Sequence, residues 1–109
     1  MDEETAIRFC DSRNGFATRD KGFLAELTAA RRAGVTLSAN LPFLLFPKSA
    51  PKTGVLLVHG FSASPREMYG VGERLAEAGY VALGVRLPGH GTSPADLRTR
   101  RFEEWLQTV

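Results

Sequence analysis

The sequence has few of the residues that build covalent or metal-bound frameworks. It contains one cysteine, Cys10, and two histidines among its 109 residues. A single cysteine excludes an intramolecular disulfide and a cysteine-rich metal site, and it favours a reducing compartment. The two histidines, His59 and His90, belong to separate predicted loops with no third ligand near either in sequence. We therefore predict no metal site.

Long apolar runs are also missing. The longest, Leu41 to Phe46, is interrupted by Pro42 and falls far short of the ~20 residues that a membrane-spanning helix needs. The N-terminus, Met1-Asp2-Glu3-Glu4, is acidic where a secretory signal is basic, and no apolar segment follows it. We expect a cytoplasmic protein with no stable membrane insertion.

Neither sign of charge is in large excess. There are 14 basic and 12 acidic residues, so the formal net charge is only +2. This excess is too small for a polybasic surface, and nucleic acid is not an expected partner. The one dense basic run, 98–101, directly precedes an acidic helical segment, and we interpret it as a solvated helix start. The 43% of apolar and 24% of charged residues are typical of a globular domain.

The first 40 residues predict an N-terminal helical segment. Residues 1–17 show no strong period, and Arg13-Asn14-Gly15 indicates a turn. From about Asp20 to Ala33 apolar residues recur at helical spacing, and Gly34 suits the end of a helix. A strand is predicted around 43–46, followed by a loop to Gly54.

Residues 55–87 predict a βαβ unit. Val55 to Val58 is short and wholly apolar, as expected of a parallel strand buried on both faces. Ser64-Pro65-Arg66-Glu67 matches an N-cap serine, a proline at N1 and a glutamate that completes a capping box. Gly70 and Gly72 within this helix are expected to permit close packing on the sheet. The second strand runs over 81–87, parallel to the first.

Two further helices are predicted after the second strand. Ser93-Pro94 offers another capped start, and an apolar helix face is formed by Phe102, Trp105, Leu106 and Val109. No capping signal follows this last helix. We therefore predict one incomplete α/β domain over 1–109: a helical segment (1–40), then strands and the βαβ unit (41–109), with a mostly parallel sheet of about three strands.

The junction between Val58 and the following helix is the strongest candidate site. In an α/β protein it lies at the C-terminal edge of the sheet, where backbone N–H groups can meet negative charge. We expect Gly60 to adopt unusual backbone dihedrals, and the N–H of Phe61 to point into the cleft as an oxyanion donor, with its ring lining an acyl or alcohol pocket. The plain alternative is a structural loop that happens to contain glycine.

Ser62 supports a competing interpretation. The stretch 60–64 nearly matches the G-x-S-x-G nucleophile elbow, between a strand and a helix as that motif requires. However, Ser64 replaces the last glycine and is assigned to the helix cap, and His59 is too close in sequence to act as a base. We therefore treat Ser62 as a substrate-lining residue, although a hydrolase that uses it as nucleophile stays open.

No cofactor is expected. A dinucleotide site requires three glycines between a strand and a helix. Gly70-Val71-Gly72 lies inside a predicted helix and lacks the third glycine.

Three stretches together resemble the N-terminal part of an α/β-hydrolase: 56–65, 75–81 and the turn-containing 86–93. The resemblance covers residues 41–109 and is closest to the carboxylesterase, monoglyceride-lipase and serine-aminopeptidase-like group. It implies that Phe61 donates an oxyanion N–H, with Gly60 and Ser62 beside the substrate. It also implies that His59 and His90 hold loops in place by hydrogen bonds. In this family the order is Ser, Asp or Glu, then His, so all three would lie beyond Val109.

The resemblance implies a serine hydrolase that acts on small ester or acyl substrates. This chain would supply the oxyanion loop and no nucleophile, and it is expected to be inactive alone. The alternative is a non-catalytic interaction module. The strand at 55–58 would lack its next neighbour, and an unpaired apolar edge favours self-association.

Overall fold

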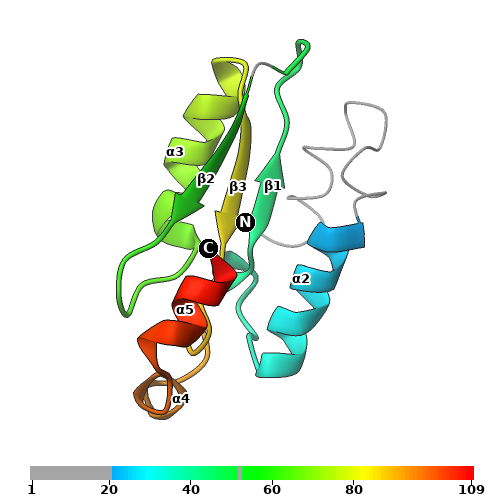
Figure 1. Ribbon diagram of the computed structural model, residues 1–109. Coiled ribbons are helices and arrows are strands. Elements are labelled where there is room, and N and C mark those ends of the chain that lie inside the picture. The colour runs from blue at the N-terminus through cyan, green and yellow to red at the C-terminus, as the bar shows by residue number, and fades with distance from the viewer. Residues whose placement is uncertain (1–20, 52) are drawn as a thin grey trace.

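Three strands form the sheet at the centre of the structure. A computed structural model describes residues 21–51 and 53–109 (Figure 1). Strands β1 (Phe43–Leu45), β2 (Gly54–Val58) and β3 (Val81–Val85) lie in the order β1-β3-β2. β3 pairs parallel with β2 and antiparallel with β1. The predicted α/β class with three strands is confirmed, although the sheet is mixed and holds one pair of each kind.

The predicted helices are present, with small shifts at their ends. They are α2 (Lys21–Ala33), the short 3-10 turn η2 (Ser38–Asn40), α3 (Arg66–Glu77), α4 (Pro94–Arg98) and α5 (Phe102–Thr108). The predicted start of the first helix at Asp20, the turn at 13–15 and Cys10 lie outside the described residues. No helix in the described part of the chain is long and apolar enough to cross a membrane.

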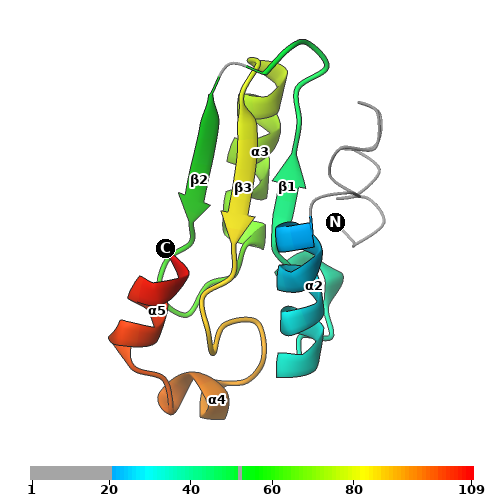
Figure 2. The same ribbon diagram turned by 45° about the vertical axis from the view of Figure 1, so that its right-hand side comes forward.

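The two long helices cover opposite faces of the sheet (Figure 2). Alternate residues of a strand point to opposite faces, and β1 divides its residues in this way. Leu44 belongs to the apolar cluster that includes α2. Phe43 and Leu45 belong to the cluster that includes α3. The core is therefore two layers of apolar side chains, one on each side of β1 and β3.

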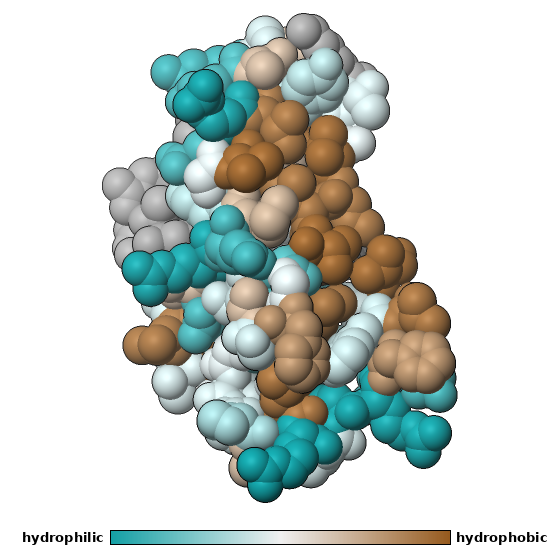
Figure 3. Space-filling model, turned by 90° about the vertical axis from the view of Figure 1, so that its left-hand side faces the viewer, coloured by the Kyte–Doolittle hydropathy of each residue, from teal (hydrophilic) through white to brown (hydrophobic). Residues whose placement is uncertain are grey.

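The outer strand β2 is covered on one face only. Leu57 is buried in the cluster under α3, whereas Leu56 and Val58 on the other face are 43% and 40% exposed. The prediction that this strand is buried on both faces is wrong. β2 lies at the sheet edge, and α2, the helix on the face opposite α3, packs on β1 and β3 and does not cover β2. In Figure 3 a continuous apolar band runs down this side of the molecule.

Phe43 explains one of the two helical glycines. Its ring is fully buried between the sheet and α3. A Cβ on Gly72 would come within 2.7 Å of this ring, and a Cβ on Gly84 of β3 would overlap it. The expected close packing therefore holds for Gly72. Around Gly70 there is open space, so its role in packing is not as predicted.

Candidate functional site

The candidate site lies where β2 and β3 both end. Their C-terminal ends point toward α4 and α5 (Figure 1). Two loops meet there: the β2–α3 loop (residues 59–65) and the β3–α4 loop (residues 86–93). This is the sheet edge at which α/β proteins place their ligands.

A tight turn shapes the β2–α3 loop. The N–H of Ala63 donates to the carbonyl of Gly60 at 3.1 Å, and Ser62 has a φ of 64°. A positive φ at the third position is the property of a type II turn. The unusual dihedral expected at Gly60 is therefore at Ser62, because the turn begins at Gly60 and its left-handed position falls two residues later. For a residue other than glycine, this conformation costs roughly 1–2 kcal/mol.

Two backbone donors at the tip of this turn have no acceptor among the described residues. They are the N–H groups of Phe61 and Ser62. The neighbouring N–H of Gly60 donates to a side chain of α3. Unpaired N–H groups beyond the end of a strand, on a backbone fixed by its own hydrogen bonds, are what an oxyanion hole requires.

The α3 side chain that accepts from Gly60 N is Glu67, so the capping box predicted for Ser64 and Glu67 is wrong. Its Oε2 accepts the hydrogen bond from Gly60 N at 2.8 Å. No side-chain hydrogen bond caps the start of α3, and Ser64 contributes its backbone carbonyl instead, which accepts from Glu67 N at 3.0 Å. The Glu67 carboxylate therefore bonds the β2–α3 loop at Gly60 instead of closing a capping box with Ser64. By contrast, Ser93 caps α4 as predicted, accepting from Asp96 N.

His59 joins the two loops. It is only 3% exposed, and its Nε2 accepts a hydrogen bond from Leu87 N at 3.1 Å. Its Nδ1 lies 2.9 Å from the carbonyl of Gly60, so we assign the proton to Nδ1. Burial lowers the pKa of His59 below its ordinary value of 6.5, against the opposing effect of the Gly60 hydrogen bond.

Acid is expected to destabilise the chain through His59. Its pKa is lower in the folded than in the unfolded state, so the unfolded chain binds a proton first as the pH falls. The contribution to stability is complete above about pH 6.5 and is lost as the pH falls below it. Urea unfolding at about pH 7.5 and about pH 5 measures this loss. In His59→Gln, which keeps an acceptor for Leu87 N without titrating in this range, the loss should be smaller. An unchanged loss would contradict the prediction.

His90 anchors the β3–α4 loop from within. It is 2% exposed, its Nδ1 lies 3.1 Å from the carbonyl of Pro88, and its own carbonyl accepts from Arg86 at 3.0 Å. Its Nε2 is buried without a partner among the described residues. Its ring lies 4.8 Å from that of His59, centroid to centroid, and both contribute to a ring cluster, defined as His59, Phe61, His90 and Trp105.

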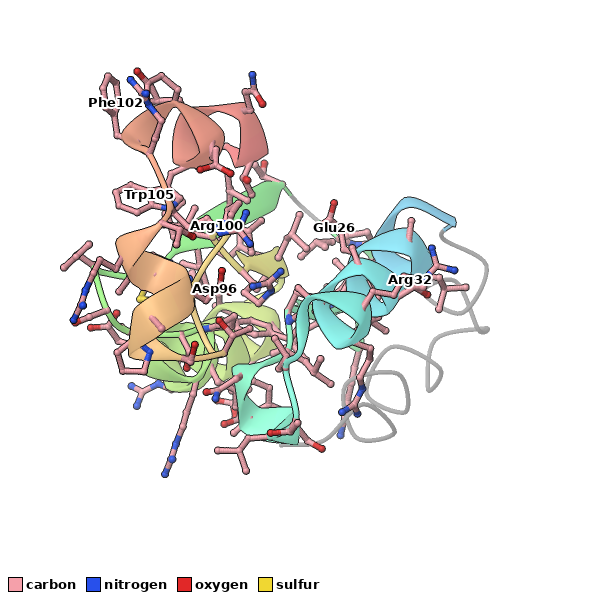
Figure 4. All side chains as sticks on the ribbon, turned by 90° about the horizontal axis from the view of Figure 1, so that it is seen from below. Glu26, Arg32, Asp96, Arg100, Phe102 and Trp105 are labelled. Carbon is pink, nitrogen blue, oxygen red and sulfur yellow. The ribbon has the colours of Figure 1, made fainter. Side chains whose placement is uncertain are left out.

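A polar network ties the β3–α4 loop to the helices that follow. Asp96 of α4 accepts from the hydroxyl of Thr92 at 2.5 Å and pairs with Arg100 at 3.0 Å. Figure 4 shows Asp96 and Arg100 close together beneath the sheet. Arg100 also pairs with Glu104 of α5 at 3.1 Å. The Thr92 hydroxyl, followed by Arg100, lowers the pKa of Asp96, which therefore stays ionised as this network requires.

Two adjacent hollows, of about 500 and 310 Å³, open beside the turn. Both are lined by Asn40, Ser62 and Gly91, so Ser62 lies on the wall of each hollow. Gly60 and Phe61 line neither hollow, and Phe61 is 71% exposed. Its ring packs on Trp105 and His90 instead of lining a pocket. Asn40, on the turn after α2, was not predicted at the site, because no motif marks it.

Comparisons with known proteins agree with this architecture. No family model matches the chain. A curated protein named thermostable monoacylglycerol lipase, from Bacillus sp. (strain H-257), is 41% identical over 73 residues, which are 67% of this chain and 28% of that protein. A solved structure of the metagenome-derived lipolytic enzymes LipS and LipT superposes with a TM-score of 0.59 at 34% identity. That match covers 67% of this chain and 29% of the other.

The chain is therefore α/β-hydrolase-like and corresponds to the N-terminal portion of that fold. Within the superfamily, both of these similar proteins are lipolytic: one is named a monoacylglycerol lipase and the other is described with lipases and esterases. The chain spans less than a third of the length of either protein.

Proposed function

We propose that this chain is the oxyanion-loop segment of a serine hydrolase that acts on carboxylic esters. The observation that carries the proposal is the unpaired N–H of Phe61 on a hydrogen-bonded turn beyond the end of β2. A donor held there before the reaction stabilises the negative charge that develops on a tetrahedral intermediate, at no cost in reorganisation.

The reaction would be acyl transfer through a serine that this chain does not supply. The serine oxygen attacks the ester carbonyl, and the carbonyl oxygen becomes an oxyanion that accepts a hydrogen bond from Phe61 N–H. Gly60, Phe61 and Ser62 form the loop beside the substrate. His59, Ser64 and His90 hold the two loops through the contacts described above. The chemistry requires no metal or organic cofactor.

The names of the similar proteins support the proposed substrate class. A relative named monoacylglycerol lipase supports a small ester or acyl substrate for the complete enzyme. The single cysteine supports a reducing compartment such as the cytoplasm.

The test is an ester-hydrolysis assay on the 109-residue chain. We expect no turnover of a short-chain nitrophenyl ester and no labelling by a fluorophosphonate, which reacts with activated serines. Ser62→Ala serves as the matched control. Turnover or labelling that Ser62→Ala abolishes would establish Ser62 as the nucleophile and overturn the proposal.

Self-association is the second candidate, and the exposed face of β2 favours it. Within the described residues β2 is an edge strand that pairs with β3 alone, and its Leu56 and Val58 are exposed. Such an edge can pair with a second copy. Sedimentation of the chain separates the two ideas: a defined dimer that Leu56→Lys converts to a monomer would favour an interaction module, and a monomer would exclude it.

A further inference from the structure

Aromatic rings from three separate segments meet behind the β2–α3 loop. Phe61 comes from that loop, His90 from the β3–α4 loop, and Trp105 from α5. The ring centroids of Phe61 and Trp105 lie 5.8 Å apart, and those of His90 and Trp105 lie 5.6 Å apart. Both pairs have the edge-to-face arrangement, which contributes roughly 0.5–1.5 kcal/mol per pair beyond the burial of area.

Within the ring cluster, Trp105 is the residue that contacts both the β2–α3 loop and the β3–α4 loop. Besides its two ring contacts, its Nε1–H donates to the carbonyl of Pro88 at 2.9 Å. One side chain on α5 therefore holds the backbone of one loop by a hydrogen bond and the side chain of the other by ring packing. Phe61 as a whole is 71% exposed, and its ring contacts within the described chain are those with Trp105 and His90.

The other apolar residues of α5 do not contribute to this cluster. Phe102 and Leu106 are 61% and 67% exposed. Figure 4 shows Trp105 on the side of α5 that faces the rest of the molecule and Phe102 on the outer side. Of the apolar residues of α5, Trp105 therefore packs on the site, whereas Phe102 and Leu106 do not.

We propose that Trp105 is a positioning residue for the β2–α3 loop, clamping the Phe61 side chain to the Pro88 turn and so fixing where the Phe61 N–H points. This role rests on the proposed function of that N–H. The clamp acts at the tip of the loop, where the N–H groups of Phe61 and Ser62 have no acceptor among the described residues. The rest of the loop is held by the Ala63–Gly60, Gly60–Glu67 and Glu67–Ser64 bonds, by the contacts of His59 and by the buried Pro65.

Hydrogen exchange of individual loop amides tests the clamp without any substrate. The reporters are the bonded N–H groups of Gly60 and Ala63, and Leu83 at the centre of β3 is the reference. In Trp105→Leu, we expect exchange at Gly60 and Ala63 to be about tenfold faster relative to Leu83, a change of about 1.4 kcal/mol in the local opening equilibrium. Trp105→Phe keeps a ring but loses the Pro88 bond, so it should restore part of the protection.

Leu106→Ala is the matched control on the same helix, and it should leave the loop amides unchanged. Equal acceleration at Leu83 and at the loop would show general destabilisation and overturn the positioning role. So would unchanged exchange at Gly60 and Ala63. If Trp105→Leu does not fold, Trp105→Phe decides alone, since loss of the Pro88 bond should still accelerate the loop amides selectively. Because no ester is involved, failure here would leave the proposed hydrolase function standing, and a failure of that function would leave the clamp standing.

Discussion

Gly84→Ala is expected to lower the free energy of unfolding by about 3 kcal/mol, enough to unfold a marginal chain. Gly84 lies in β3, the central strand of the sheet, and is paired with Phe43 of β1 and Leu57 of β2. A Cβ at this position would overlap the ring of Phe43, which is fully buried between the sheet and α3. The ring has little room to move aside, because it packs so closely on Gly72 of α3 that a Cβ there would lie only 2.7 Å from it. Urea unfolding followed by far-UV circular dichroism measures the loss.

The matched control is Gly70→Ala in α3. Beyond its chain neighbours and its own helix backbone, no atom lies within 4 Å of the Cβ it would add. The substitution should therefore raise stability by up to about 1 kcal/mol through helix propensity alone. A second variant, Gly84→Ala with Phe43→Leu, should recover part of the loss because the smaller side chain makes room. If Gly84→Ala and Gly70→Ala had the same effect, the packing of Phe43 would not be the reason for these glycines.

Periodicity was sufficient to predict the helices and strands, and it failed where burial depends on a neighbour. The apolar run at the start of the βαβ unit predicts a strand, and β2 is there. The same run predicts burial on both faces, yet Leu56 and Val58 are exposed. An apolar residue is compatible with burial in a core. Whether it is buried depends on which other elements pack over it, and its own strand does not specify them. The same reasoning applies to α5, whose apolar face is exposed at Phe102 and Leu106.

The loop was identified from sequence, but its internal geometry was not. A glutamate three residues after a serine fits a capping box, and the spacing alone could not indicate that Glu67 bonds Gly60 N instead. The left-handed residue is Ser62 and not the glycine, because the turn's hydrogen bond sets that position. Trp105 is distant in sequence from Phe61, so its contact depends on how α5 packs after α3, β3 and α4. These are tertiary features, and no local pattern encodes them.

The Phe61 N–H itself is tested most directly by Phe61→Pro in a complete hydrolase that carries this segment. Proline has no N–H, and it is favoured at the second position of a type II turn, which Phe61 occupies between Gly60 and Ser62. The substitution therefore removes the donor while the turn is retained. Removal of one oxyanion donor should lower kcat by roughly 10²–10³-fold. Steady-state kinetics on a short-chain ester measure this.

Phe61→Ala separates the side chain from the backbone donor. It keeps the N–H and removes the ring that packs on Trp105 and His90, so its effect should vary with the substrate and stay well below that of Phe61→Pro. Unfolding of both variants in the 109-residue chain checks that the turn is retained. Both lose the ring contacts, so proline should differ from alanine in stability by less than about 1 kcal/mol. A kcat in Phe61→Pro equal to that in Phe61→Ala would mean that the backbone of Phe61 donates no hydrogen bond to the transition state. A large loss in Phe61→Ala with all substrates alike would assign the effect to the position of the loop, and hence to the ring packing that Trp105 provides.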